Sequence, residues 1–140
     1  MDGIDKGANW WMEQCYRLSL DYVIKNRSNL APLIEYCFIA PRVECEDGFS
    51  MSVQASKGHY CSPRKDHSYP YEEVEVGYPS MEEACLLPYA ERPDDPTGTL
   101  YGCVPIELVD KLIEKHGGIA MDPYAPYEEG YFSPIEGEHL

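Results

Sequence analysis

The segment RVECEDGFSMSVQAS, residues 42–56, alternates apolar and polar side chains on both sides of a turn, and this alternation limits the pairing to one β-hairpin register. A two-residue turn at Asp47-Gly48 would place carboxylates on the apolar face of the hairpin. A three-residue loop that also includes Glu46 avoids this and gives Gly48 the left-handed bulge position. The predicted cross-strand pairs are Cys45 with Phe49 and Val43 with Met51, while Ser50, Ser52 and Gln54 face outward.

Two more segments have the composition of strands. Residues 71–78 alternate valines with acids, which predicts that Glu73 and Glu75 lie on the exposed face of a strand. We expect this strand to pair antiparallel with residues 49–57. Residues 99–104, TLYGCV, are another strand candidate.

Two amphipathic helices are predicted, over residues 10–26 and 105–116. Asn9 is a suitable N-cap for the first. Pro105 opens the second, and Gly117-Gly118 closes it in a Schellman ending. The expected fold class is therefore α+β, a small antiparallel sheet of three or four strands with these two main helices packed on one face.

Two short segments complete the predicted elements. Ser80 and Glu83 form a capping-box pattern, which predicts a short helix to Leu87, stopped by Pro88. The apolar run 33–40 is either a buried strand or a helical turn, because periodicity does not distinguish the two in so short a run.

The length of 140 residues suits one domain, which we place at 1–119, followed by an acidic, Tyr- and Pro-rich tail at 120–140. No run of about 18 apolar residues and no secretory signal is present, so we expect a cytoplasmic location and no membrane partner. The six cysteines include no C-x-x-C pair, which favours free, mostly buried thiols over a zinc ribbon or a disulfide framework.

The acids are concentrated in the second half of the chain. Residues 1–70 hold nine acids and eight bases, a net charge of -1, whereas residues 71–140 hold sixteen acids and three bases, a net charge of -13. This balance disfavours direct binding of nucleic acid or of an anionic membrane and favours a basic protein partner.

The sharper hypothesis is that these carboxylates mimic the phosphates of nucleic acid, and that tyrosine rings add contact area. The alternative is a solvated face that only keeps the protein soluble. The predicted partner-binding residues are Glu73 and Glu75 on a strand, Glu107, Asp110 and Glu114 on the outer face of the second helix, and Tyr127, Glu128, Glu129 and Tyr131 in the tail.

The loop 58–70 offers two other chemistries. His59, Cys61 and His67 could hold zinc or activate a thiol, but their spacing is not a recurrent ligand pattern and a fourth ligand is missing. We therefore expect no metal and no other cofactor.

Tyr60 and Arg64 in the same loop could stack on a base and clamp a phosphate. No glycine-rich phosphate cradle accompanies them. They are the alternative ligand-binding residues, in a nucleotide pocket that would lie between two copies of the chain.

Three segments resemble small accessory proteins encoded by phages and prophages of Gram-positive bacteria: MSVQASKGHYCSPR, YEEVEVGYPS and GTLYGCVPIELVDKLIEKHGGI. The resemblance covers about residues 49–119 and contains no catalytic motif. It implies an accessory phage product, and small acidic proteins of this kind often inhibit bacterial immunity, including CRISPR systems. No functional residue is carried over from the family.

Three functions are consistent with these observations. The first is a non-enzymatic inhibitor that blocks a basic site on a host nuclease such as a CRISPR effector. The second is a sponge that sequesters a nucleotide immune signal. The third is a thiol or zinc hydrolase that uses Cys61.

Overall fold

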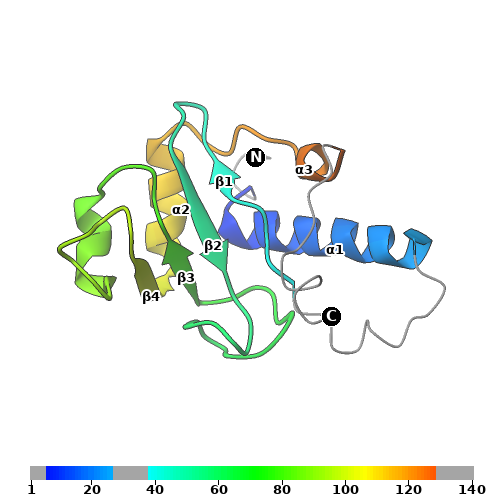
Figure 1. The fold of residues 1–140 in the computed structure, drawn as a ribbon, viewed down its shortest axis with the longest axis horizontal. Helices are drawn as coiled ribbons and strands as arrows, with labels where there is room; N and C mark the ends of the chain where they lie inside the picture. The colour runs from blue at the N-terminus through cyan, green and yellow to red at the C-terminus, as the bar shows by residue number, and fades with distance from the viewer. Residues whose placement is uncertain (1–5, 27–37, 129–140) are drawn as a thin grey trace.

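The computed structural model describes residues 6–26 and 38–128 (Figure 1). Its strands form one antiparallel sheet in the order β1-β2-β3-β4, so the chain is an α+β protein as predicted. The elements are α1 (Ala8–Asn26), β1 (Val43–Glu44), β2 (Ser50–Gln54), β3 (Glu73–Gly77), the 3₁₀ helix η3 (Ala84–Tyr89), β4 (Leu100–Pro105), α2 (Ile106–Lys115) and α3 (Tyr124–Glu128).

The predicted hairpin register is confirmed. Val43 pairs with Met51 across β1 and β2, and the Cys45 N–H donates to the Phe49 carbonyl at 2.8 Å. Gly48 has a φ of 96°, the left-handed conformation that a three-residue loop requires. The alternation of apolar and acidic side chains was therefore sufficient to define this turn.

The outward position predicted for Gln54 is wrong. Its side chain is buried, and its amide accepts the Ala40 N–H and donates to the Ala40 carbonyl, both at 2.9 Å. The described part of the predicted segment 33–40, residues 38–40, is neither strand nor helix, and the rest of it lies outside the described residues. A buried amide paired with an irregular backbone explains why a polar side chain faces the interior here.

The strand predicted at 71–78 is β3, and it pairs antiparallel with β2 as expected. The exposed position predicted for Glu75 is wrong, because this side chain is only 7% exposed. A register shift between Val74 and Val76 in the pairing with β4 interrupts the simple alternation, and all three residues are buried. Residues 60–62 also cover the Glu75 side chain, whose carboxylate accepts the Tyr60 N–H at 3.3 Å.

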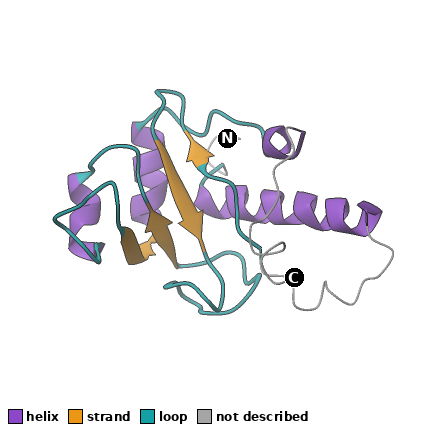
Figure 2. Ribbon diagram, viewed as in Figure 1, coloured by secondary structure: helices purple, strands orange, loops and turns teal. Residues whose placement is uncertain are grey.

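In the view of Figures 1 and 2, α2 and the start of α1 lie behind the sheet, and the two helices contact each other. The Trp11 side chain of α1 is fully buried and donates from Nε1 to the Pro41 carbonyl at 2.8 Å. In α2 the predicted apolar arc is confirmed by the buried side chains of Val109, Leu112 and Ile113. The two helices thus supply one side of a core whose other side is the sheet.

Asn9 is not the N-cap of α1, which begins one residue earlier. Its side chain instead pairs with the backbone of Tyr71, donating to the carbonyl at 3.0 Å and accepting the N–H at 2.7 Å. The cap comes from α2, where an Asp110 carboxylate oxygen accepts the Ala8 N–H at 2.9 Å. A carboxylate 102 residues away in the sequence therefore stabilises the positive end of the α1 dipole.

The Schellman ending of α2 is confirmed. Gly118 donates to the Ile113 carbonyl at 2.9 Å and Gly117 to the Glu114 carbonyl at 3.0 Å, and both glycines have positive φ. The chain then runs back along β1, where Ile119 bridges Cys45. This pairing covers the outer edge of the sheet.

The helix predicted at 80–87 is replaced by η3, which begins at Ala84 and contains Pro88. Neither capping-box side chain caps it. The Ser80 hydroxyl accepts the Ser50 N–H at 2.9 Å, and Glu83 bonds to residues at the end of α2. Long-range partners therefore override the local capping pattern.

We expect Asp110→Ala to lower the free energy of unfolding by about 1 kcal/mol, the usual effect of losing a helix cap. Gly7→Ala should act in the same direction, because a Cβ there would lie 2.4 Å from an Asp110 carboxylate oxygen. Urea unfolding measures both. Glu107→Ala on the same helix is the control and should change stability little; an equal loss in that control would contradict the cap.

Candidate functional site

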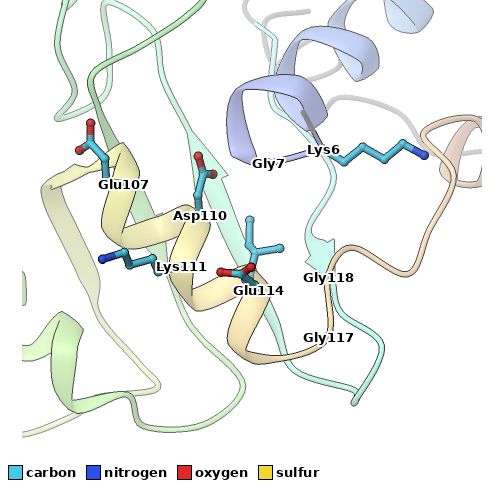
Figure 3. Close-up of a pocket in the computed structure, with 9 residues that line it drawn as sticks. Lys6, Gly7, Glu107, Asp110, Lys111, Glu114, Gly117 and Gly118 are labelled. Atoms are coloured by element: carbon cyan, nitrogen blue, oxygen red, sulfur yellow. The ribbon is translucent and has the colours of Figure 1, made fainter. Parts of the chain in front are cut away.

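The exposed face of α2 carries three carboxylates, Glu107, Asp110 and Glu114, at the helical spacing that the sequence predicted. They line a surface pocket of about 550 Å³ between α2, the start of α1 and the turn after α2, which we call the α2 pocket (Figure 3). Its lining residues are Lys6, Gly7, Glu107, Asp110, Lys111, Ile113, Glu114, Gly117 and Gly118.

The two lysines of the α2 pocket do not neutralise its carboxylates by direct contact. The Lys6 side chain extends away from α2 in Figure 3, and its Nζ lies 5.6 Å from the centroid of the Trp10 ring. Within residues 6–26 and 38–128, no ion pair joins Lys6 or Lys111 to a carboxylate of the pocket. The pocket lining holds three carboxylates and two lysines, a net charge of -1, and its carboxylates are not ion-paired with those lysines.

Asp110 differs from Glu107 and Glu114 because its carboxylate also caps α1 by accepting the Ala8 N–H. Burial raises the pKa of its carboxyl group, the hydrogen bond from Ala8 lowers it, and the charge of Glu107 raises it again, so that the net shift is upward. Glu107 and Glu114 make no such backbone contact within residues 6–26 and 38–128. They are the two carboxylates of the pocket that are free to meet a partner.

Glu46 is a further carboxylate beside the α2 pocket that the sequence did not indicate. It is exposed, its N–H donates to the Gly118 carbonyl at 3.0 Å, and its Cβ lies 2.9 Å from the place where a side chain on Gly117 would begin. Glu46 could be placed there only from the pairing of residues 118–120 with β1, and no local sequence pattern indicates that pairing.

The strand carboxylates do not join this site. Glu73 is half-buried and hydrogen-bonded to the Cys103 thiol, and Glu75 is buried beneath Tyr60. Burial raises the pKa of Glu75, the Tyr60 bond lowers it and Glu91 raises it, with a net upward shift. Glu75 therefore does not face a partner as predicted, because the interrupted alternation in β3 turns it inward, and the partner-binding role predicted for Glu73 stays a prediction.

The remaining predicted partner-binding residues lie in the tail. The backbone of Tyr127 and Glu128 forms the end of α3, which contacts α1. Their side chains, and all of Glu129 and Tyr131, lie outside the described residues. Their predicted contribution to a surface therefore stays a prediction.

Tyr60 and Arg64 do lie together. The Arg64 guanidinium carbon is 4.9 Å from the centroid of the Tyr60 ring, and its Nε donates to the Lys57 carbonyl at 3.2 Å. Tyr60 is 49% exposed, so part of the ring stays open to solvent. The arrangement offers one cation and one aromatic surface for a ligand.

The three side chains considered for zinc are engaged elsewhere. His59 Nδ1 lies 2.7 Å from the Ser56 hydroxyl, the Cys61 thiol donates to the Ser56 carbonyl, and His67 stacks on Tyr16. No group of three or more metal-ligating side chains is gathered in the part of the chain that the structure describes. Burial also raises the pKa of the Cys61 thiol, which disfavours the nucleophilic thiolate.

An ionic cluster at the end of α2, with two buried and two exposed members, was not predicted from the sequence. His116 is 6% exposed, stacks on Phe49 with ring centroids 4.0 Å apart, and contacts two carboxylates. Its Nδ1 lies 2.6 Å from Asp47 and its Nε2 lies 2.8 Å from Glu83. Lys115 bonds the other oxygen of Glu83 at 2.7 Å. Sequence periodicity had placed His116 only in the apolar arc of α2.

The cluster favours the charged form of each member. Burial alone lowers the pKa of His116, but its hydrogen bonds to both carboxylates outweigh burial, and the net pKa lies above the ordinary 6.5. Burial raises the pKa of Glu83, and the bonds from Lys115 and His116 bring it below 4.5. For Asp47, the bonds from Phe49 and His116 bring the pKa below 3.8. His116 therefore links the hairpin loop, the approach to η3 and α2 as an imidazolium.

Comparison with known proteins gives no match: no family model, no curated protein and no solved structure is detectably similar to this chain. The resemblance to phage proteins therefore stays a prediction. Within the described ranges, none of the helices is both long enough and apolar enough to cross a membrane.

We expect the His116 cluster to make stability depend on pH. The raised pKa of His116 contributes stability below 6.5 that is lost as pH rises through the folded-state value. The lowered pKa values of Asp47 and Glu83 contribute stability that is lost as pH falls below their ordinary range. The contribution of His116 to the free energy of unfolding in urea should therefore increase from about pH 8 to about pH 6, whereas His59 and His67, whose pKa values burial lowers, act in the opposite direction.

His116→Gln tests the source of this dependence. It should lower stability by about 1–3 kcal/mol, because Glu83 loses a partner while buried, and it should flatten the rise toward pH 6. His59→Gln is the matched control, since the pKa of His59 is lowered by burial. A rise that persists in His116→Gln and disappears in the control would contradict the assignment.

Proposed function

We propose that this protein is a non-enzymatic, phage-encoded inhibitor of a bacterial defence system that acts in the host cytoplasm. It binds a basic, nucleic-acid-handling site on a host protein, such as the nuclease of a CRISPR system. The observation that supports this most is the α2 pocket, where Glu107 and Glu114 face solvent without an ion pair among the described residues.

The carboxylates of α2 form a row along the helix. Glu107 and Glu114 are seven residues apart, which corresponds to about 10 Å along a helix axis, with Asp110 between them. The three carboxylates are therefore about 5 Å apart on average, a wider spacing than that of the phosphates along one strand of a duplex, about one per 3.4 Å. A site built from Lys and Arg to hold phosphates would attract this face, and the net charge of -14 adds long-range steering.

Asp110 is best left unchanged in a test of binding, because it caps α1. We expect the double variant Glu107→Lys/Glu114→Lys to bind its target about tenfold more weakly or worse, since it replaces two attractive charges with two repulsive ones. Immobilised full-length protein is incubated with bacterial lysate, and the captured proteins are identified by mass spectrometry. The wild type should retain nucleic-acid-binding proteins that duplex DNA or added salt releases.

The control variant Asp21→Lys/Glu72→Lys makes the same change in net charge at exposed positions outside the α2 pocket. It should retain the captured proteins. Capture that resists DNA and salt, or an equal loss in both double variants, would show that the α2 pocket is not the binding site.

A second candidate function is supported by the contact between Arg64 and Tyr60. In this case the protein is a sponge that sequesters a nucleotide immune signal, with the base on the tyrosine ring and a phosphate on the guanidinium. Cyclic or ADP-ribose-type nucleotides should then raise the melting temperature, and Arg64→Ala should abolish the shift. Arg92→Ala, another exposed arginine, is the control. The absence of a shift with every such nucleotide would remove this candidate.

A further inference from the structure

The 3₁₀ helix η3 is made only of apolar and aromatic residues, ACLLPY, and yet Leu86 is its single buried member. Ala84, Cys85 and Pro88 are exposed, and the two remaining residues are half-buried. The chain just before η3 adds Tyr78 and Met81, which are 49% and 50% exposed. We call Tyr78, Met81 and the exposed residues of η3 the η3 surface.

Tyr78 holds an unfavourable backbone conformation that keeps it in place. Its φ is 49°, in the left-handed region that bulky residues seldom adopt. Both of its backbone groups are fixed, because its N–H donates to the Thr99 carbonyl at 3.0 Å and its carbonyl accepts from Arg42 at 2.7 Å. A half-exposed aromatic ring on a restrained backbone has the preorganisation that interface anchors use.

The rim of this surface is acidic. Residues 78–98 hold five acids and one base, and Glu82, Glu91, Asp94 and Asp95 are exposed. Two cations from other segments lie beside them, Arg42 on the Tyr78 carbonyl and Lys115 on Glu83, so that five acids face three bases. The fifth acid, Glu83, is turned inward toward Lys115 and His116. This rim repels an anionic membrane, and it also repels a second copy of the same surface.

We propose that the η3 surface is a docking site for an amphipathic basic helix of a partner protein, with apolar side chains on Tyr78 and η3 and with Lys or Arg side chains against the acidic rim. Tyr78, Met81 and the exposed residues of η3 lie within eleven successive positions, 78–88, and a patch of exposed apolar residues marks an interaction site. The charge of the rim selects a basic occupant. This inference does not depend on the function proposed for the α2 pocket. The residues involved are different, and η3 lines no part of that pocket.

The test uses the full chain and two synthetic helical peptides, each with leucine along one face and with either lysine or glutamate on the other. Cys85 lies within the η3 surface and Cys103 outside it, and both are exposed. The Leu/Lys peptide should slow alkylation of Cys85 and leave that of Cys103 unchanged, as measured by mass spectrometry. The Leu/Glu peptide should protect neither thiol.

Two variants locate the contact. Tyr78→Asn removes the ring but keeps a residue that tolerates positive φ, and Met81→Gln is a second variant that does not alter this backbone. Either should weaken Leu/Lys peptide binding, Tyr78→Asn by about tenfold or more. Tyr124→Asn, which removes another exposed tyrosine, should have no effect. The Glu107→Lys/Glu114→Lys protein should still bind, so failure here is distinguishable from failure of the α2 pocket.

Equal protection of Cys85 and Cys103, equal binding of both peptides, or unchanged affinity in both Tyr78→Asn and Met81→Gln would overturn the proposal. So would a dimer in size-exclusion chromatography that dissociates in either variant, because a second copy would then be the occupant.

Discussion

The buried imidazole of His116 joins three segments that are far apart in the chain: the hairpin loop through Asp47, the approach to η3 through Glu83, and the end of α2. A buried charge is tolerated only where partners satisfy it, so the three segments are stable together in one arrangement and costly to separate. The contact between His116 and Asp47 also positions a carboxylate at the surface of the protein. With Asp47 held against α2, the neighbouring Glu46 comes to lie against Gly117 and adds its carboxylate beside the α2 pocket.

Along one face of α2, the carboxylate of Asp110 stabilises the fold, whereas the carboxylates of Glu107 and Glu114 face solvent. Asp110 caps α1 and approaches Gly7 so closely that a larger residue there would displace it. Glu107 and Glu114, one turn before and after it on the same face, contact no backbone donor among the described residues. The two outer carboxylates can therefore be changed without loss of the α1 cap. Acidic residues that look equivalent in the sequence thus differ in what their removal would cost.

Local patterns in the sequence predicted the elements whose signals are local. The turn at Gly48, the ending at Gly117 and the apolar arc of α2 each depend on residues within a few positions of one another, and each is confirmed. The predictions are wrong where a residue far away in the sequence bonds the side chain instead of a local partner. Asn9 bonds Tyr71 instead of capping its own helix, and Glu75 is drawn inward by the shift in β3 and by the Tyr60 backbone. For the same reason the acidic face of α2 could be predicted, and the pocket beneath it could not.

The acidic face of α2 and the η3 surface are separate, since Glu114 lines the α2 pocket whereas Lys115 bonds Glu83 just before η3, and no residue of the η3 surface lines that pocket. The two surfaces suit different parts of a binding process. Exposed carboxylates act over several ångströms and mainly raise the rate of association, in a salt-dependent way. Apolar side chains act only in contact and mainly slow dissociation. A basic partner with an apolar stripe would gain both effects from one chain, because the His116 cluster holds the approach to η3 rigidly against α2.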